Sequence, residues 1–352
     1  MKVGAAAFVL LVAGAGCAAG RVPDVSTATP PMPRPGPRAR ADAANANAAC
    51  EGCHPGAAAT WRGSLHARSW TEPIFQRSFA EEPSGFCRDC HAPEPAAPAL
   101  GVACVTCHDP GATGVVLAAE GAPVTRGPAP HRVVRDPGFA GDGACAGCHE
   151  FAFPDAGQRA GAVALMQRTA TEHLASRFAD RTCASCHMPK LARGGRGHAF
   201  AVASDPSMLR RAVVARVTRD GDGSVSFELM PGEVGHAFPT GDLFRRVVVV
   251  AEVIGDDYQL VVHAERALAR HFHTERAVAG AAMQRERADD RIQGPRPTRV
   301  ELELGPLARG REIAWRVEWQ RVQSMHDAEA VIADTVVVAE GRLSPAQRGL
   351  VP

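Results

Sequence analysis

The pattern of hydrophobic and polar residues divides the chain into two unlike parts. After residue 205, apolar and polar side chains alternate in short runs, most clearly at Val225–Leu229, Val300–Leu304 and Ile313–Trp319. A period of two predicts strands with one buried face. Two valine-rich runs, residues 247–250 and 331–338, predict strands that are buried on both faces. Six or more strands of this kind predict a β-sandwich-like domain over residues 206–352.

The part before residue 206 lacks this alternation and is interrupted by many Pro, Gly and Ala residues. One stretch, residues 157–178, predicts a helix, because apolar positions recur about every 3.6 residues. Its shared face carries Val163, Met166, Ala170, His173 and Arg177. We therefore expect a loop-rich helical domain over residues 49–205, and an α+β protein of two domains for the whole chain of 352 residues.

The N-terminus predicts export from the cytoplasm. Met1-Lys2 precedes an apolar run, Val3–Val12, and small residues then lead to Cys17. Residues 1–17 therefore read as a secretory signal peptide, which is too short for a permanent membrane helix. The small residues before Cys17 resemble the lipobox of bacterial lipoproteins and predict a lipid anchor on this cysteine; the alternative is simple cleavage near Ala19. Both place the protein in the periplasm or at the outer membrane or cell surface.

A linker rich in proline and alanine follows over residues 18–48. It contains five prolines between positions 30 and 37. Proline removes backbone donors and blocks helix formation, so this segment is expected to be an extended, semi-rigid tether.

Ten of the eleven cysteines fall in five Cys-x-x-Cys-His units. The units are Cys50–His54, Cys87–His91, Cys104–His108, Cys145–His149 and Cys183–His187, with second cysteines at Cys53, Cys90, Cys107, Cys148 and Cys186. This spacing is the attachment signature of c-type haem. The two thiols lie on one side of a helical turn and can form thioethers to one haem, while the histidine binds the iron as proximal ligand. The sequence therefore predicts five haem c groups.

Structural zinc and disulfides are the alternatives to haem for these cysteines. Zinc sites also use Cys-x-x-Cys pairs, but a histidine directly after every second cysteine is not their usual spacing. Disulfides would leave the five adjacent histidines without a role.

Composition and charge agree with haem and argue against nucleic acid. Aromatic residues make up only 5% of the chain, and haem would supply the missing apolar bulk. The formal net charge is +1, and about ten propionates from five haems would make the holoprotein acidic. No basic block interleaves with aromatic residues, so nucleic acid is not an expected partner.

Each iron can take a second histidine on its distal face. The chain offers His66, twelve residues after the first unit, His198, eleven after the last, and His131 between the third and fourth units. For His66 and His131 the alternative is a surface histidine. His173 is a fourth candidate, on the apolar face of the predicted helix. It could instead be a packing residue, because His173-Leu-Ala-Ser-Arg-Phe178 parallels Trp61-Arg-Gly-Ser-Leu-His66, which matches His173 with Trp61.

The order of these motifs resembles a known family. The order of the Cys-x-x-Cys-His units, two of which stand close together at residues 87–108, is similar to that of multihaem cytochromes c related to cytochrome c554. Three further motifs share this similarity: Trp61-x-x-Ser-x-His66, Met166-Gln-x-Thr169, and Cys186-His-Met-Pro189 with a following His198-x-Phe200. Gly235-His-Ala-Phe-Pro-Thr-Gly241 resembles the motif that joins the haem region to a C-terminal β-domain in many such proteins. Asp289-Asp-Arg-Ile292 is similar to the linker before their late strands.

The resemblance implies a helical, loop-rich domain held together by its haems, bis-histidine irons and electron transfer. It also implies that His236 leans onto the haem domain as a fifth distal ligand; the alternative is a turn histidine bonded to backbone. One departure concerns His173, because members that carry MQxTxxEW have Trp at that position.

These features predict a multihaem c-type cytochrome that carries electrons among redox partner proteins of the cell envelope and has no catalytic residues. The alternative is a multihaem oxidoreductase with one open haem that acts on a small nitrogen or sulfur compound. Against it, the chain lacks the Cys-x-x-Cys-Lys unit typical of pentahaem nitrite reductases. Hydroxylamine oxidoreductases depend on a tyrosine cross-linked to haem, and the one tyrosine here, Tyr258, lies in the predicted β-domain. A partner-docking lipoprotein would account for the β-domain but not for five haem units.

Overall fold

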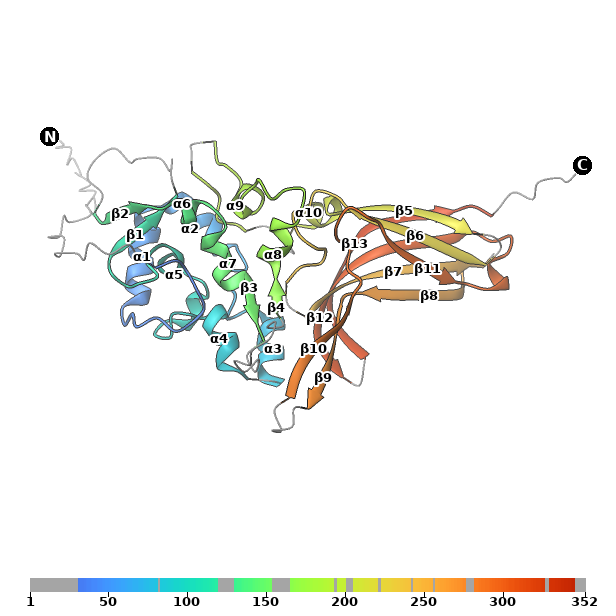
Figure 1. Ribbon diagram of the computed structural model, residues 1–352, viewed down its shortest axis with the longest axis horizontal. Coiled ribbons are helices and arrows are strands. Elements are labelled where there is room, and N and C mark those ends of the chain that lie inside the picture. The colour runs from blue at the N-terminus through green and yellow to red at the C-terminus, as the bar shows by residue number, and fades with distance from the viewer. Residues whose placement is uncertain are drawn as a thin grey trace, which may run out of the picture.

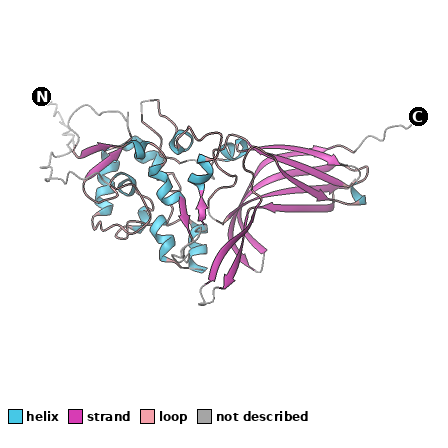
Figure 2. Ribbon diagram, viewed as in Figure 1, coloured by secondary structure: helices cyan, strands magenta, loops and turns pink. Residues whose placement is uncertain are grey.

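A computed structural model describes residues 31–81, 83–119, 130–153, 165–192, 195–200, 205–220, 223–241, 243–255, 257–276, 282–326 and 329–345. The predicted signal peptide, Cys17, Ala19 and the first part of the linker lie outside these residues. The chain forms a helical half, residues 31–211, and a strand-rich half, residues 213–345, which lie at opposite ends of an elongated molecule (Figures 1 and 2). The predicted α+β class is confirmed.

The helical half consists of short helices joined by loops. Its helices are α1 (Ala43–Cys53), α2 (Pro55–Arg62), α3 (Pro73–Glu81), α4 (Gly85–His91), η1 (Pro98–Leu100), α5 (Cys104–His108), α6 (Pro137–Ala140), α7 (Gly143–His149), α8 (Thr169–Leu174), α9 (Cys183–His187) and α10 (Pro206–Arg211). Several begin with proline in the first turn, where its missing N–H is not needed. Two small strand pairs, β1 (Val115–Ala118) with β2 (Arg132–Arg135) and β3 (Glu150–Ala152) with β4 (Leu165–Arg168), complete this half.

The helix expected over residues 157–178 is only partly present. Residues 165–168 form β4, which pairs antiparallel with β3 through Glu150 opposite Arg168. The helical part is α8, Thr169–Leu174, and turns follow it. The helical periodicity therefore predicted the wrong element at Met166, because pairing with β3 supplies the backbone hydrogen bonds of this segment.

The second part of the predicted linker is not a tether in this structure. Residues 31–42, here called the strap, lie along the helical half, and α1 begins at Ala43. Gly36 N–H donates to the Asp89 carbonyl over 3.1 Å, and Arg38 N–H donates to the Pro93 carbonyl over 2.8 Å. Proline gives the strap its extended form, and neighbouring carbonyl groups take its N–H donors.

The strand-rich half contains two main sheets. Their strands are β5 (Val213–Asp220), β6 (Ser224–Pro231), β7 (Arg245–Ile254), β8 (Leu260–Leu268), β11 (Thr298–Glu303), β12 (Ile313–His326) and β13 (Glu329–Leu343), with η2 (Pro306–Ala308) between β11 and β12. The sheet orders are β11-β6-β5 and β13-β12-β7-β8, and all neighbours are antiparallel. A separate hairpin joins β9 (Arg270–Arg276) to β10 (Ala282–Asp289).

The inner faces of the two sheets share one hydrophobic core. On β6 the alternating residues Val225, Phe227 and Leu229 have no exposed surface (0%). They meet Val247, Val249 and Trp319 of the other sheet in one cluster of 22 buried residues. Residues 247–250 of β7 are buried on both faces, as their sequence predicts. Residues 331–338 are not, because β13 is an edge strand and leaves Val331 42% exposed.

The helical half has no comparable core of its own. Among its described residues the buried hydrophobic cluster contains only Trp61, Ala103 and Val105. A domain of this length ordinarily buries well over half of the surface that its unfolded chain exposes. Side chains alone therefore do not account for the packing of this half. Within the described residues no helix is long and apolar enough to span a bilayer.

The two halves contact each other directly. The α3 helix lies against β12, where Arg77 and Ser78 each donate a hydrogen bond of 2.7 Å to Gln323. Near it, Arg321 forms an ion pair with Glu72 over 3.2 Å. Further contacts around α8 hold the loop that carries His236, which bears on the candidate site.

Candidate functional site

All five Cys-x-x-Cys-His units end a short helix. Four helices, α4, α5, α7 and α9, finish at the histidine of their unit, and α1 finishes one residue before His54. This geometry places both thiols on one side of a turn and the histidine just beyond it, as the spacing predicts. None of these ten cysteines forms a disulfide. Among the described residues, no group of three or more His, Cys, Asp or Glu is arranged to hold a metal ion.

Several thiols of the units are partly shielded from water. Burial raises the pKa of Cys104 to about 11 and that of Cys107 to about 12, and it also raises the pKa of Cys50. Burial therefore disfavours the thiolate, which is the form in which a cysteine ligates a metal.

Four unit histidines face a second histidine. The ring centres are 6.5 Å apart for His54 and His131, and 6.1 Å apart for His66 and His149. The other pairs are His108 with His198, at 6.1 Å, and His187 with His236, at 6.3 Å. Two metal–imidazole bonds of about 2.0 Å, plus the distance from each nitrogen to its ring centre, span about 6 Å. The spacing of all four pairs therefore suits one iron between two imidazoles.

Hydrogen bonds fix how these rings point. Nδ1 of His108 lies 2.8 Å from the Leu117 carbonyl, and Nδ1 of His236 lies 3.0 Å from the Ala237 carbonyl. His91 and His198 make equivalent Nδ1 contacts, to the carbonyls of Ser69 and Arg196. A backbone carbonyl on Nδ1 fixes the tautomer and leaves Nε2 to bind a metal.

Two other candidate distal ligands are marked by a buried ring nitrogen and not by a hydrogen bond. Nδ1 of His66 and Nδ1 of His131 are buried and have no hydrogen-bond partner among the described atoms. Because an unpaired buried nitrogen is costly, protein hydrogen bonding alone does not account for these rings. This observation supports the fit of an iron-binding group at both sites.

Three of the paired histidines, His66, His149 and His236, are held in their neutral form. Burial, and then the positive charge that His149 would carry, lowers the pKa of His66 to about 3. Burial lowers the pKa of His149 and that of His236 to about 4 each. A neutral imidazole is the form that binds a metal.

The structure argues against our prediction that His173 is a distal ligand. Both of its ring nitrogens meet backbone carbonyls: Nδ1 lies 2.8 Å from Gly235 O, and Nε2 lies 2.7 Å from Arg181 O. The ring is 7% exposed and fits so closely that a Cβ on Gly235 would approach Nδ1 to 2.9 Å. No nitrogen is left for iron.

His173 instead has the role of Trp61, which was the alternative. The Trp61 ring nitrogen donates to the carbonyl of Val102 over 2.9 Å, and Val102 stands two residues before Cys104. The carbonyl partner of His173, Arg181, likewise stands two residues before Cys183. The two segments are therefore equivalent in structure as well as in sequence.

Around His91 the neighbours are aromatic. The ring of Phe75 stacks on His91 with 3.8 Å between ring centres and 6° between planes. Phe75 in turn contacts Trp70 and Phe79 at 5.8 Å and 5.7 Å. This cluster packs the α3 helix against the second unit.

Each of the five units lies beside at least one other unit. Asn47 of α1 accepts a 2.8 Å hydrogen bond from Cys104 N–H, which joins the first unit to the third. The thiol of Cys90 lies beside that of Cys148, and the thiol of Cys145 lies beside that of Cys183, so the fourth unit adjoins both the second and the fifth.

The third and fourth sites meet through an aromatic ring that sequence reasoning did not single out as a functional residue. Phe200 contacts the imidazole of His66 edge-on at 4.2 Å and that of His198 at 5.9 Å. Its backbone lies in the left-handed region at φ 46°, which is unusual for a residue with a side chain. The His198-x-Phe200 pattern was the available signal, but its ring contacts are not visible in the sequence.

The loop that delivers His236 is clamped between the two halves by buried charges. Arg291 forms ion pairs with Glu172 of α8 and, at 2.9 Å, with Asp289 of β10. Arg291 also donates to the Pro239 carbonyl of the loop over 2.9 Å. We call Arg168, Glu172, Asp289 and Arg291 the interface network; Arg168 pairs with Glu172 and Asp289. The linker-like Asp289-Asp-Arg291 was a signal for this network, whereas its partners on α8 were missed.

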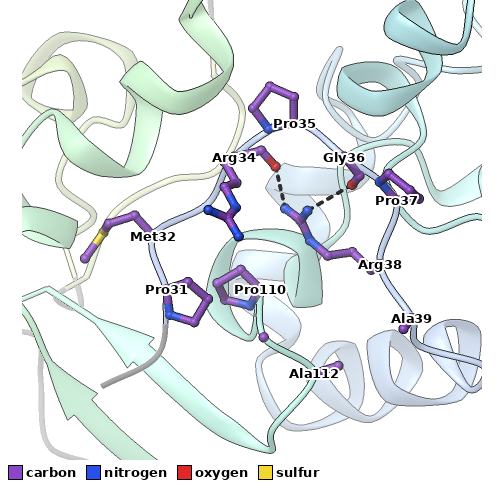
Figure 3. A pocket seen from close by; sticks show the side chains of 11 residues that line it. Pro31, Met32, Arg34, Pro35, Gly36, Pro37, Arg38, Ala39, Pro110 and Ala112 are labelled. Carbon is purple, nitrogen blue, oxygen red and sulfur yellow. Dashed lines mark hydrogen bonds between the residues drawn. The ribbon is translucent and has the colours of Figure 1, made fainter. Parts of the chain in front are cut away.

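The strap closes a pocket of about 320 Å³. Residues 31–39 line one side and Pro110–Ala112 the other (Figure 3). The Arg38 guanidinium turns back to the carbonyls of Arg34 and Gly36 at 2.8 Å and 2.9 Å. None of the unit cysteines or candidate ligands lines this pocket.

Comparisons with known proteins agree with this geometry at the level of the fold. No family model and no curated protein matches the chain. Among solved structures, the chain is similar to a penta-heme cytochrome c552 from Thermochromatium tepidum, with a TM-score of 0.62 and 18% sequence identity. The match covers 84% of this chain and 97% of that one. The chain therefore has the fold of a multihaem cytochrome c.

Proposed function

We propose that this protein is an electron carrier with five haem c groups attached to its five Cys-x-x-Cys-His units. The observation that carries the proposal is the set of four facing histidine pairs at 6.1–6.5 Å between ring centres. Five like units, the small side-chain core of the helical half and the fold it shares with a penta-heme cytochrome support the number of haems. When bound, haem supplies reversible one-electron chemistry at iron.

The residues of the chain would hold the haems as follows. Each cysteine pair anchors one macrocycle, and the histidine of the unit binds iron from the proximal side. His131, His66, His198 and His236 are the proposed distal ligands opposite His54, His149, His108 and His187. Two imidazoles fill both axial positions at these four sites and leave no position for a substrate. Because the units contact one another, electrons can pass between neighbouring sites without leaving the protein.

One observation favours the alternative, a multihaem oxidoreductase with one open haem. His173 is engaged by two carbonyls, so the candidate distal ligands number four rather than the expected five. Such an enzyme would act on a small nitrogen or sulfur compound. Tyr258 does not support it, because this tyrosine is 89% exposed beside β8, in the strand-rich half.

Reoxidation of the reduced holoprotein by nitrite or hydroxylamine separates the two functions. An electron carrier is expected to be reoxidised by neither compound beyond the rate seen with free haem, although its haem at His91, which has no assigned distal ligand, can bind carbon monoxide. An enzyme is expected to bind carbon monoxide at about one haem in five and to be reoxidised by its substrate. Ferric EPR on the same sample counts low-spin and high-spin irons independently.

The sequence of residues 1–17 supports a proposal about the location and partners of the protein. We propose that residues 1–17 direct export, that Cys17 carries a lipid anchor, and that the protein exchanges electrons with redox proteins of the bacterial cell envelope. Haem c attachment outside the cytoplasm supports this location. Metabolic labelling with a fatty acid, compared between the natural chain and Cys17→Ser, tests the anchor.

A further inference from the structure

Glu94 is a buried carboxyl group between two haem units. It stands three residues after His91 and ten before Cys104, in the link between α4 and η1. Its side chain has no exposed surface (0%), and among the described carboxyl residues no other is as completely buried. A buried carboxyl is costly when ionised, so its presence calls for a physical reason.

The hydrogen bonds of Glu94 lead to the third unit. Oε1 accepts from the Thr106 hydroxyl over 3.1 Å, and Thr106 lies between Cys104 and Cys107. Thr106 itself is fixed by a 3.1 Å bond from Ala103 N–H to its hydroxyl. Oε2 is buried with no hydrogen-bond partner among the described atoms. One carboxyl oxygen is therefore tied to the unit, and the other can carry a proton.

The charges that face Glu94 are nearly balanced. They are Arg38 and Arg40 of the strap and Asp109, the residue after α5. Arg40 and Asp109 form an ion pair of 2.5 Å with each other, so much of their charge cancels. Burial raises the pKa of Glu94, while the Thr106 hydroxyl and the two guanidinium groups limit the rise. The carboxyl thus lies where a change in a nearby charge can shift its protonation.

We propose that Glu94 is a proton-coupled redox group: its carboxylate takes up one proton from solvent water when the haem held by Cys104, Cys107 and His108 receives one electron from a protein reductant. Oxidation of the same haem releases the proton. This inference rests on the proposed function. Such proton uptake would make the reduction potential of this haem depend on pH. It would also lower the free-energy cost of adding a negative charge to an interior from which water is excluded.

The physical reason is the low effective dielectric constant of the site. An electron added a short distance from a buried carboxylate raises the energy of the ionised form, because like charges repel strongly where water is excluded. Uptake of a proton cancels the added charge. Full coupling of one proton to one electron corresponds to a slope of about 59 mV per pH unit, since a tenfold change in an equilibrium constant equals that potential.

Spectroelectrochemical titration of the holoprotein between about pH 5 and pH 9 tests the inference. The test variant is Glu94→Gln, which keeps an acceptor for Thr106 but cannot ionise. The matched control is Glu51→Gln, which removes a carboxyl on α1 that also lies near Cys104 but is ion-paired with Arg62. Circular dichroism and the low-spin visible spectrum show whether each variant is folded and loaded.

The natural protein and Glu51→Gln are expected to show one reduction wave whose midpoint falls with rising pH, and Glu94→Gln is expected to lose most of that slope. Reduced-minus-oxidised infrared spectra should show a protonated carboxyl band that Glu94→Gln lacks. Equal slopes in all three proteins, with no such band, would overturn the inference and leave electron transfer intact. Absence of reversible haem reduction in the natural protein would instead defeat the proposed function itself.

Discussion

At the scale of single residues, the two nitrogens of an imidazole distinguish a ligand from a packing residue. The ring of His236 gives one nitrogen to a backbone carbonyl and faces His187 at 6.3 Å. The ring of His173 gives both nitrogens to carbonyls. A haem ligand needs one ring nitrogen for the iron, which the arrangement of His236 provides. The arrangement of His173 suits a residue that packs segments of the chain together.

Replacing His173 and replacing His198 should therefore have opposite effects. His173→Ala is expected to keep the number of low-spin haems but to lower the free energy of unfolding by about 1–3 kcal/mol, because a buried backbone carbonyl loses the ring N–H that faces it. His198→Ala is expected to turn one haem high-spin. Ferric EPR and denaturant unfolding of both variants measure the difference. A new high-spin signal in His173→Ala would restore His173 as a ligand.

Spacing in the sequence was sufficient to locate the units and several of their partners. His66 and His198 follow a unit at a distance that lets a short loop return over the ring, and the structure brings both against other unit histidines. Which histidine faces which could not be predicted, since His66 faces His149 and not the nearby His54. The burial of Glu94 could not be predicted from the sequence either, because it depends on how the strap folds against this carboxyl group.

At the scale of elements, the strap shows why a proline-rich segment need not be a free tether. Extended backbone exposes its N–H groups, and the loops of the helical half present carbonyl groups to accept them, as Pro93 does for Arg38. Composition predicted the extended form of residues 31–42, but their docking depends on partners that are distant in the sequence. The pairing of β4 with β3 also escaped prediction, because the residue pattern of β4 alone does not reveal its partner strand.

The fit of the strap predicts different effects of the same substitution in two units. Gly147 and Gly52 occupy the same position in their units, but a Cβ on Gly147 would come within 2.3 Å of the Pro33 carbonyl, whereas none of the atoms around Gly52 would lie within 4 Å. Gly147→Ala should release the strap and make residues 31–42 cleavable by protease. Gly52→Ala should be neutral or raise stability by up to about 1 kcal/mol. Equal cleavage in both variants would count against the docked strap.

The interface network should contribute to stability through its buried charges. Arg291→Met leaves Glu172 and Asp289 without their main partner, which is expected to lower the free energy of unfolding by about 3–5 kcal/mol and to loosen the His236 loop. Arg299→Met is the control, because Arg299 is 74% exposed in its pair with Glu228 and should cost at most about 1 kcal/mol. Denaturant unfolding gives both values, and similar losses in the two variants would refute the buried role.

This network also predicts a dependence on pH. Burial alone would raise the pKa of Asp289, but the hydrogen bonds and charge of Arg291 outweigh it and hold the pKa below its ordinary value. The contribution of the Asp289–Arg291 pair to the free energy of unfolding is therefore complete above the pKa of Asp in the unfolded chain, about 3.9. This contribution is lost as the pH falls through the lower pKa of Asp289 in the folded protein. The stability difference between the natural protein and Arg291→Met should shrink below about pH 4. A difference that stays constant down to about pH 2 would contradict this.

At the scale of the whole molecule, the two halves differ in what holds them together. The strand-rich half contributes most of one cluster of 22 buried residues, whereas the cluster within the helical half has three among its described residues. Alternation in the sequence predicted the first core. The second half could be assigned only through its cysteines, because porphyrin, and not side chains, is expected to fill it.

Protein produced without haem attachment should therefore be only half folded. Limited proteolysis is expected to digest the helical half first and to leave a resistant fragment that begins near residue 205. The holoprotein, digested in parallel, should resist along both halves. Equal resistance of the two halves in the haem-free protein would show that the helical half folds without its cofactor.

Intact-mass measurement of the purified protein, followed by mapping of its haem peptides, tests the central claim most directly. When the protein is made with a competent haem-attachment system, the account predicts the mature polypeptide plus five haem masses, with one haem on each Cys-x-x-Cys-His peptide. A mass without added haem, or units that remain unmodified, would contradict it.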